Sequence, residues 1–265
     1  WPRARRSHSL TSLGPGRDEI YLFGGLAGKE REPTGGELDD LWVFNASTRL
    51  WSAVFCTGDQ PDNRHSHTMV CHEGKLFLFG GCGTHRHPDK HGRAAFNDVW
   101  EFDTQVTSDG EARWWRAVAG DVDDPSLYDQ ENPVRPCPRY LHIAAVLDRC
   151  MVIHGGRTVP RGGSNSYRTL SDTWSLDLRS YVWTRLRQDG PVPAPFLHSH
   201  VAIPHSGKGP NGSRGRQRGL RLVSGHEAGG GWRGVMTEVV IVSADVPPPR
   251  GNGEDADRTV VLPRP

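Results

Sequence analysis

The 265-residue sequence lacks three features that would each indicate a particular class of protein. It has no excess of one charge, because 32 Lys and Arg stand against 31 Asp and Glu for a net charge of +1. This balance argues against nucleic acid or a membrane surface as a partner. It has no run of about 18 consecutive apolar residues, as a membrane-spanning helix would need. No segment shows the apolar period of a helix.

Cysteine is scarce and irregularly placed. The five thiols belong to Cys56, Cys71, Cys82, Cys137 and Cys150, an odd number without a paired spacing. This usage favours reduced thiols over a disulfide framework, so we expect a cytoplasmic or nuclear protein. The N-terminal Trp-Pro-Arg-Ala-Arg-Arg has neither an apolar signal core nor an initiator Met. We therefore expect a domain of a longer protein, with companion domains outside these residues.

Glycine and proline are abundant, with 32 and 20 residues, which suits many short strands and turns. Within this background one cassette occurs three times. An Arg-x-x-His comes first, then an apolar run that ends in Gly-Gly, then an Asp-x-Trp and a further Trp. The apolar runs with their glycines are 20–25, 75–81 and 150–156. A repeat of this length determines the fold, because each copy is one supersecondary unit.

The second copy predicts four strands. They are expected at 67–71, 76–79, 99–102 and 115–118, with a tight turn at 72–75. The second strand is apolar at every position, which indicates that other sheets cover both of its faces. The glycines that end it are expected where φ is positive or where no side chain fits.

These motifs resemble the kelch repeat, over roughly residues 3–243. The resemblance implies an all-β fold, a β-propeller of four-stranded blades that pack on one another through the repeated Trp residues. We expect a propeller domain at 1–246 with blades at about 3–58, 59–120, 134–190 and 193–246, then a Pro-rich linker or tail at 247–265 in which 260–262 are a candidate edge strand. The fourth blade is degenerate and carries a Gly- and Arg-rich insertion at 207–219. Because kelch rings usually have more than four blades, we expect an incomplete ring or a fragment.

Residues that recur in every blade are predicted to be structural, because a catalytic centre needs different residues brought together asymmetrically. Besides the arginines of Arg-x-x-His and Asp40, Asp98 and Asp172, they are His8, Gly24, Gly25, Trp42, Trp51, His67, Gly80, Gly81, Trp100, Trp115, His142, Gly155, Gly156, Trp174 and Trp183. Trp114 is the alternative to Trp115 as the closing Trp of the second blade.

Because consecutive antiparallel strands alternate in direction, the sequence predicts that the binding loops lie on one rim of the blades. The second-to-third-strand loops (26–38, 82–96 and 157–170) and the blade connection 119–138 are long and share that rim. Variable loops on a rigid scaffold are where binding usually occurs. The candidate partner-binding residues there are Arg31, His85, Arg86, His87, Lys90, His91, Tyr128, Arg157, Arg161, Tyr167 and Arg168. Their arginines and histidines would form charge-assisted hydrogen bonds to acidic groups of a partner.

The leading hypothesis is a non-catalytic interaction module that binds a protein or peptide and needs no cofactor. The resemblance implies roles such as the substrate receptor of a ubiquitin ligase or a trafficking or cytoskeletal adaptor. The alternative is a metal-dependent enzyme, similar to kelch-containing copper radical oxidases or to iron-dependent proteins with Glu-x3-Asp-x3-His. Neither ligand pattern can be placed on this sequence. A third alternative is a degenerate structural spacer without a partner. Cys82, His85, His87 and His91 are weak metal candidates, since their loop is basic and Gly-rich.

Overall fold

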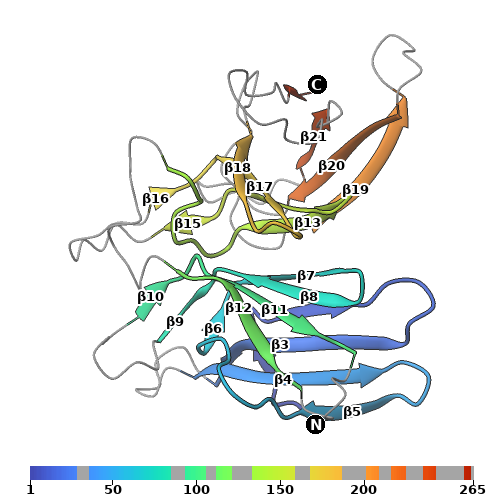
Figure 1. Ribbon diagram of the computed structural model, residues 1–265, viewed down its shortest axis with the longest axis vertical. Helices are drawn as coiled ribbons and strands as arrows, with labels where there is room; N and C mark the ends of the chain where they lie inside the picture. Colours follow the sequence, from blue (N-terminus) through green and yellow to red (C-terminus); the bar gives the residue numbers. More distant parts are fainter. Residues whose placement is uncertain are drawn as a thin grey trace. The chain divides into compact units, whose positions relative to one another are not determined.

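The computed structural model describes residues 1–28, 36–84, 93–105, 112–120, 133–158 and 168–186, and the backbone of the strands at 201–208, 216–224, 235–242 and 260–263. All regular structure in these residues is β-strand, as the sequence predicts (Figure 1). Within the same residues, no helix has the length and apolar character that crossing a bilayer requires. The chain divides into two compact units, residues 1–142 with 157–168 and residues 143–156 with 169–265. Each unit is described by itself.

Blade 1 is an antiparallel sheet in the first unit, drawn in blue in Figure 1. Its strands are β1 (Arg5–Arg6), β2 (Ser9–Ser12), β3 (Glu19–Ala27), β4 (Glu37–Asn45) and β5 (Leu50–Val54). They pair in the order β2-β3-β4-β5, and β1 pairs with the far end of β3.

Blade 2 follows the four-strand prediction to within a residue or two. Its sheet contains β7 (Thr68–His72), β8 (Lys75–Phe79), β11 (Val99–Asp103) and β12 (Trp114–Val118), paired in that order. The turn between β7 and β8 has two central residues, Glu73 and Gly74, both with positive φ. Such a turn matches the right-handed twist of the strands that it joins. All four residues of the apolar run in β8 are buried, so both faces of this strand are covered.

Short strands lie beyond the Gly-Gly end of each sheet. They are β6 (Arg64–His65), β9 (Cys82–Thr84), β10 (Arg93–Ala95), β15 (Arg157–Thr158) and β16 (Arg168–Thr169). β6 lies in the Arg-x-x-His segment, and the other four occupy the ends of the long loops predicted from the sequence.

The second unit contains two four-stranded antiparallel sheets. Blade 3 consists of β13 (Ile143–Leu147), β14 (Cys150–His154), β17 (Thr173–Asp177) and β18 (Trp183–Leu186). Blade 4 consists of β19 (Val201–Lys208), β20 (Arg216–Ser224), β21 (Val235–Val242) and β22 (Val260–Pro263).

Blade 4 differs from the sequence expectation at two places. The hairpin of β19 and β20 extends into the segment taken as an insertion, with Lys208 paired to Arg216. In the segment 247–265 the candidate edge strand forms β22, which pairs with β21 as the fourth strand of the sheet instead of lying apart in a tail. The backbone of blade 4 therefore pairs as a complete four-stranded sheet although its sequence matches the repeat poorly. Main-chain hydrogen bonds do not require the side chains of the repeat.

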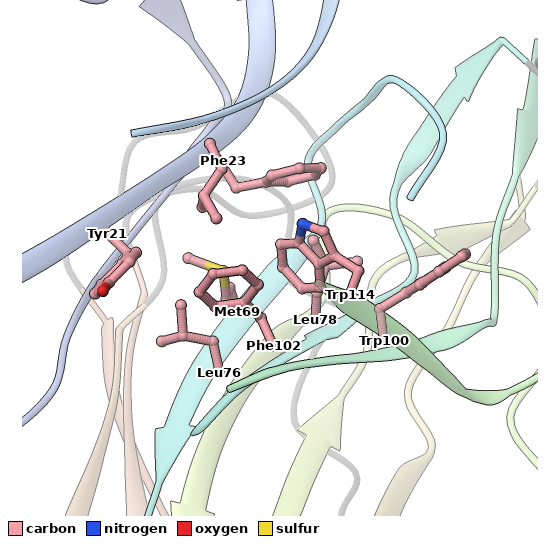
Figure 2. Close-up of a cluster of buried hydrophobic side chains, with 9 residues drawn as sticks. Tyr21, Phe23, Met69, Leu76, Leu78, Trp100, Phe102 and Trp114 are labelled. Atoms are coloured by element: carbon pink, nitrogen blue, oxygen red, sulfur yellow. The ribbon is translucent and has the colours of Figure 1, made fainter. Parts of the chain in front are cut away.

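The core of the first unit lies between blades 1 and 2 (Figure 2). It contains Tyr21, Phe23 and Leu41 from blade 1 and Met69, Leu76, Leu78, Trp100, Phe102 and Trp114 from blade 2. The rings of Phe23 and Trp114 meet edge-on at 5.3 Å, and those of Tyr21 and Phe102 lie 6.0 Å apart. Each such side chain stabilises the fold by roughly 1.5–3 kcal/mol through burial.

The closing Trp of blade 2 is Trp114 rather than Trp115. Trp114 is 5% exposed and packs in the core, whereas Trp115 is 56% exposed. The two residues are adjacent in β12, so their side chains point to opposite faces of the sheet. Trp114 pairs with Phe102, and this register turns it toward blade 1.

Candidate protein-binding face

A short antiparallel ladder lies beyond the Gly-Gly pair of each blade in the first unit. We call these the crown ladders. In blade 1 the ladder joins β1, the end of β3 and the start of β4. In blade 2 it is the sheet β6-β9-β10. In the third copy Tyr140 pairs with Arg157 of β15, and β15 pairs with β16. Each long second-to-third-strand loop thus begins and ends on a crown ladder.

A buried arginine clamp supports the crown ladder of blade 2. The side chain of Arg64 is fully buried, and its Nη1 and Nη2 donate to the two carboxylate oxygens of Asp98 at 2.7 and 2.9 Å. Nη1 also donates to the carbonyl of Gly80 at 3.0 Å. Trp100 Nε1 donates to Asp98 Oδ2 at 2.6 Å, and the guanidinium lies 4.2 Å from the ring centre of Phe96. One carboxylate therefore joins the Arg-x-x-His segment to the Asp-x-Trp strand.

Blade 1 has the same clamp with more solvent around its acid. Arg5 donates to both oxygens of Asp40 at 2.5 and 2.8 Å and to the carbonyl of Gly24 at 3.0 Å. Trp42 Nε1 donates to Asp40 Oδ2 at 2.7 Å. Burial opposes ionisation, but the hydrogen bonds from Arg5 and Trp42 outweigh it and lower the pKa of Asp40. The carboxylate therefore stays charged at neutral pH.

The Gly-Gly pair is required by the close approach of the neighbouring backbone. A Cβ on Gly24 would lie 2.6 Å from the carbonyl oxygen of Arg64, and one on Gly80 would lie 2.7 Å from that of Arg139. Both glycines also have positive φ, at 61° and 64°. Only glycine tolerates both conditions without strain.

The residue before each repeated histidine has the left-handed backbone conformation, although none of the three is glycine. Ser7, Ser66 and Leu141 have φ of 56°, 54° and 60°. They are linked in series, because the Ser66 amide donates to the Ser7 carbonyl at 2.8 Å and the Leu141 amide donates to the Ser66 carbonyl at 2.9 Å. This conformation costs about 1–3 kcal/mol per residue, which the surrounding contacts must offset.

Two repeated histidines connect one blade to the next. His67 Nε2 is hydrogen-bonded to the hydroxyl of Ser9 in blade 1, and His142 Nε2 to the hydroxyl of Thr68 in blade 2, each at 2.8 Å. We call His67 and His142 the inter-blade histidines. In each pair the hydroxyl stands one residue after the histidine of the preceding copy.

The inter-blade histidines are not poised for acid–base catalysis. Burial, with the charges of Arg64 and Arg139 adding to it, lowers the pKa of His67 well below its usual value and that of His142 to about 3. Both rings are therefore neutral at physiological pH, and their contacts show that they serve in the packing of the fold.

The crown ladders of blades 1 and 2 also contact each other through polar side chains. Thr84 Oγ1 donates to Glu37 Oε2 at 2.8 Å. Within the blade 1 ladder, the exposed Arg6 donates to the carbonyl of Gly28 at 3.1 Å. These groups lie where the ladders end and the long loops begin.

Two of the eleven partner-binding candidates are described by the structure. Arg157 is half-buried, and its backbone pairs with that of Tyr140 in both directions, at 2.9 and 2.8 Å. Arg168 is exposed on the neighbouring strand β16. The other candidates lie outside the described residues: Arg31, His85, Arg86, His87, Lys90, His91, Tyr128, Arg161 and Tyr167.

Sequence reasoning missed the Thr84–Glu37 contact and the left-handed positions Ser7, Ser66 and Leu141. A signal for the latter exists, because they hold the same place in each Arg-x-x-His. Their side chains differ, however. A requirement for the left-handed backbone conformation is visible in a sequence only where glycine meets it, and here it is met by Ser and Leu.

Within the ranges that the structure covers, no group of three or more His, Cys, Asp or Glu residues could hold a metal ion. Of the weak metal candidates only Cys82 is described, and it is a buried free thiol. His85, His87 and His91 lie outside the described residues. The five cysteines are free thiols in the structure.

The repeated arginine clamps, the Gly-Gly pairs and the strand order are features of a repeat family, and comparison with known families identifies one. The family described as the KLHDC2/KLHL20/DRC7 Kelch-repeats domain matches residues 1–208. The chain belongs to the kelch-repeat family.

Curated relatives of this kelch chain are long proteins. It is 28% identical over 200 residues to Tip elongation aberrant protein 3 of Schizosaccharomyces pombe, covering 71% of the chain and 16% of that protein. It is 27% identical to the Leucine-zipper-like transcriptional regulator 1 homolog of Drosophila melanogaster, covering 92% of the chain and 22% of the relative. It is also 27% identical to human Host cell factor 2, and this match covers 76% of the chain and 22% of the relative. The kelch chain thus spans at most about a fifth of these relatives, whose names describe no enzymatic activity.

Proposed function

We propose that this kelch chain is a non-catalytic interaction module that binds a protein or peptide partner through the face formed by its crown ladders and their loops. The observation that carries the proposal is that each long loop begins and ends on a ladder held by internal hydrogen bonds. In blade 2 a fully buried arginine anchors the ladder. A rigid base that presents variable loops is the usual arrangement of a binding surface.

The chemistry of the loops favours an acidic partner. Arg157 and Arg168 come from the third crown ladder, and the neighbouring sequence adds Arg161 and Tyr167. Arginine and tyrosine are enriched at the energetic centres of protein interfaces. Guanidinium groups recognise carboxylates or phosphates through paired hydrogen bonds. A role as the substrate receptor of a ubiquitin ligase, or as an adaptor in trafficking, the cytoskeleton or transcription, is consistent with this chemistry.

The repeated polar residues support a scaffold rather than a catalytic centre. The inter-blade histidines are buried and bonded to hydroxyl groups, and the clamp carboxylates are each occupied by an arginine and a tryptophan. Groups occupied in this way have no position from which to act on a substrate.

The test compares two triple variants that remove the same charge from opposite ends of the blades. The loop-face variant replaces Arg157, Arg161 and Arg168 by alanine. The control variant replaces Arg17, Arg49 and Arg179, which lie in turns at the other end of the strands.

Partner proteins are captured from a lysate of the source cells with the purified chain and are quantified by mass spectrometry. The loop-face variant should retain a specific partner at least about tenfold less than the parent, because several charge-assisted hydrogen bonds are lost. The control should retain it, and both should keep the parent's melting temperature. Equal capture by both variants would contradict the proposal. A loop-face variant that unfolds would assign its arginines to the scaffold.

A further inference from the structure

Positive charge is concentrated in one segment of this kelch chain. Residues 190–226 contain no Asp or Glu and five basic residues: Lys208, Arg214, Arg216, Arg218 and Arg221. Since the whole chain has a net charge of +1, subtracting this +5 leaves −4 for the remaining residues. The balance of the whole chain therefore conceals a basic segment, and such an asymmetry indicates an anionic partner.

The outer part of the β19–β20 hairpin is a two-stranded ribbon that lies within this segment. The two strands, drawn in orange in Figure 1, form eight residue pairs, the last of which joins Lys208 to Arg216. Among the described strands, β21 pairs with β20 only over residues 220–224. Residues 205–208 and 216–219 thus pair with each other alone, and we call them the basic ribbon. The corresponding hairpin of blade 3 has five pairs, so the ribbon is an addition of blade 4.

The register places three cations on one face of the basic ribbon. Lys208 is directly opposite Arg216, and Arg218 stands two residues further along the same strand, opposite Ser206. Residues directly opposite each other, and residues two apart in one strand, share a face. Like charges at opposite positions destabilise a strand pair. An anion bound on this face would offset that repulsion.

The composition of the ribbon favours a nucleic acid over an acidic protein. Residues 205–219 contain no Phe, Trp, Tyr, Leu, Ile, Val or Met. A protein interface has buried aromatic and apolar groups at its centre, and this segment supplies none. Interfaces with nucleic acid are more polar and more positive, and at least about half of their hydrogen bonds go to phosphate and sugar. Arginine suits phosphate because its planar guanidinium donates two parallel hydrogen bonds.

We propose that the basic ribbon binds the phosphate backbone of a nucleic acid without reading its base sequence. Lys208, Arg216 and Arg218 neutralise phosphates along one face of the ribbon. A two-stranded ribbon also has a width that the major groove of duplex DNA admits. Without an aromatic residue the ribbon has no platform on which bases could stack, so the contacts are to the backbone.

This inference is independent of the proposed function. The basic ribbon belongs to the hairpin between the first and second strands of blade 4. Because consecutive antiparallel strands alternate in direction, this hairpin lies at the end of the blade opposite to its second-to-third-strand loop. The crown ladders and their loops take no part in it.

Fluorescence anisotropy of labelled oligonucleotides tests the proposal on the full chain. Duplex DNA, single-stranded DNA and single-stranded RNA are compared, and binding to any of the three supports the ribbon as a phosphate-binding surface. Each neutralised phosphate contributes about −0.9 for a duplex, or about −0.7 for a single strand, to the slope of log affinity against log salt. Three cations therefore predict a slope of roughly −2 to −3, and the affinity should fall roughly 20- to 40-fold between about 50 and 200 mM salt.

Two triple variants remove the same charge from different places. The ribbon variant carries Lys208→Gln, Arg216→Gln and Arg218→Gln. The control variant carries the same change at three exposed turn arginines, Arg17, Arg49 and Arg179. The ribbon variant should bind at least about tenfold more weakly at low salt and lose most of the salt dependence, whereas the control should bind as the parent does. The loop-face variant should also keep its affinity for nucleic acid, which separates this test from that of the proposed function.

A labelled acidic peptide with the same net charge as the oligonucleotides provides the opposing arm. If the chain binds this peptide as tightly as the nucleic acids, the ribbon is a protein-binding surface and the proposal is overturned. Equal losses in the two triple variants would also overturn it. So would an absence of nucleic-acid binding at low salt, or an affinity that salt does not change. The last two outcomes are measured on the parent chain, so they decide the question even if the ribbon variant unfolds.

Discussion

Replacing Asp98 by asparagine tests whether the buried arginine clamp holds the crown ladder in place. The substitution preserves the size of the side chain but removes its charge. Two of the three hydrogen bonds to Asp98 come from the guanidinium of Arg64, whose side chain has no exposed area. In Asp98→Asn the positive charge of Arg64 stays buried without a counter-charge, and the amide presents an N–H group where the guanidinium needs an acceptor.

The expected cost follows from this burial. Breaking a buried ion pair by removing one partner costs about 3–5 kcal/mol, because the remaining charge is uncompensated. The clamp of blade 1 supplies a matched comparison with nearly the same bond lengths. Asp40 has a side chain 37% exposed, against 10% for Asp98. The side chain of Arg5 is 2% exposed, so Asp40→Asn also leaves a buried charge without a counter-charge. Water reaches the carboxylate position of this clamp, however, so that variant should lose less stability than Asp98→Asn.

Urea unfolding at pH 7, followed by tryptophan fluorescence, measures both variants. The slope of the free energy against urea concentration should stay the same, so that the midpoints report stability. Equal losses for the two variants would refute the reasoning, because the difference rests on burial alone. A loss below about 1 kcal/mol in Asp98→Asn would show that the ion pair is not required.

Three further predictions concern packing, glycine and pH. Trp114→Ala should lower the free energy of unfolding by about 3–5 kcal/mol, measured with urea, and Trp115→Ala by less than about 1 kcal/mol. The reverse order would contradict the assignment of Trp114 to the core. Gly80→Ala should destabilise more than Gly74→Ala by at least about 1 kcal/mol, since both have positive φ but only Gly80 has a carbonyl within 2.7 Å of the new Cβ. Stability should fall as the pH is lowered from 7 to 5, because the unfolded chain binds protons on the inter-blade histidines near pH 6.5 and the folded chain does not; the fall should be about 2 kcal/mol for His142, and His67 should add to it in the same direction. Replacing either of these histidines by glutamine should reduce that slope, and an unchanged slope would show that other groups cause it.

Much of each blade could be predicted from local sequence. The turn at 72–75 and the apolar run before Gly80 determine the β7–β8 hairpin, because two-residue turns and alternating side chains act over a few residues. The third strand was located by its Asp-x-Trp motif, and its partner is the preceding apolar strand. Blade 4 shows the limit of this approach, because β22 lacks the repeat's side chains and only its pairing with β21 assigns it to this blade.

The loop face could be predicted only in outline. Strand parity indicated which end of the blades carries the long loops, but the sequence did not indicate that the loop roots are themselves paired as crown ladders. Strands such as β9 and β10 are too short, at three residues each, to show a period.

The sequence by itself determined the repeat, the strands of blades 1 to 3 and the residues that recur in each, because these features depend on interactions within about 40 residues of chain. The tertiary structure decided which face each recurring side chain takes and what it meets there. Ser9 and His67 are 58 residues apart, and Thr68 and His142 are 74 apart. Trp114 and Trp115 are neighbours, yet one is core and the other is surface, because a shift of one residue in a strand reverses the face. Only the packing of one blade on the next fixes that choice.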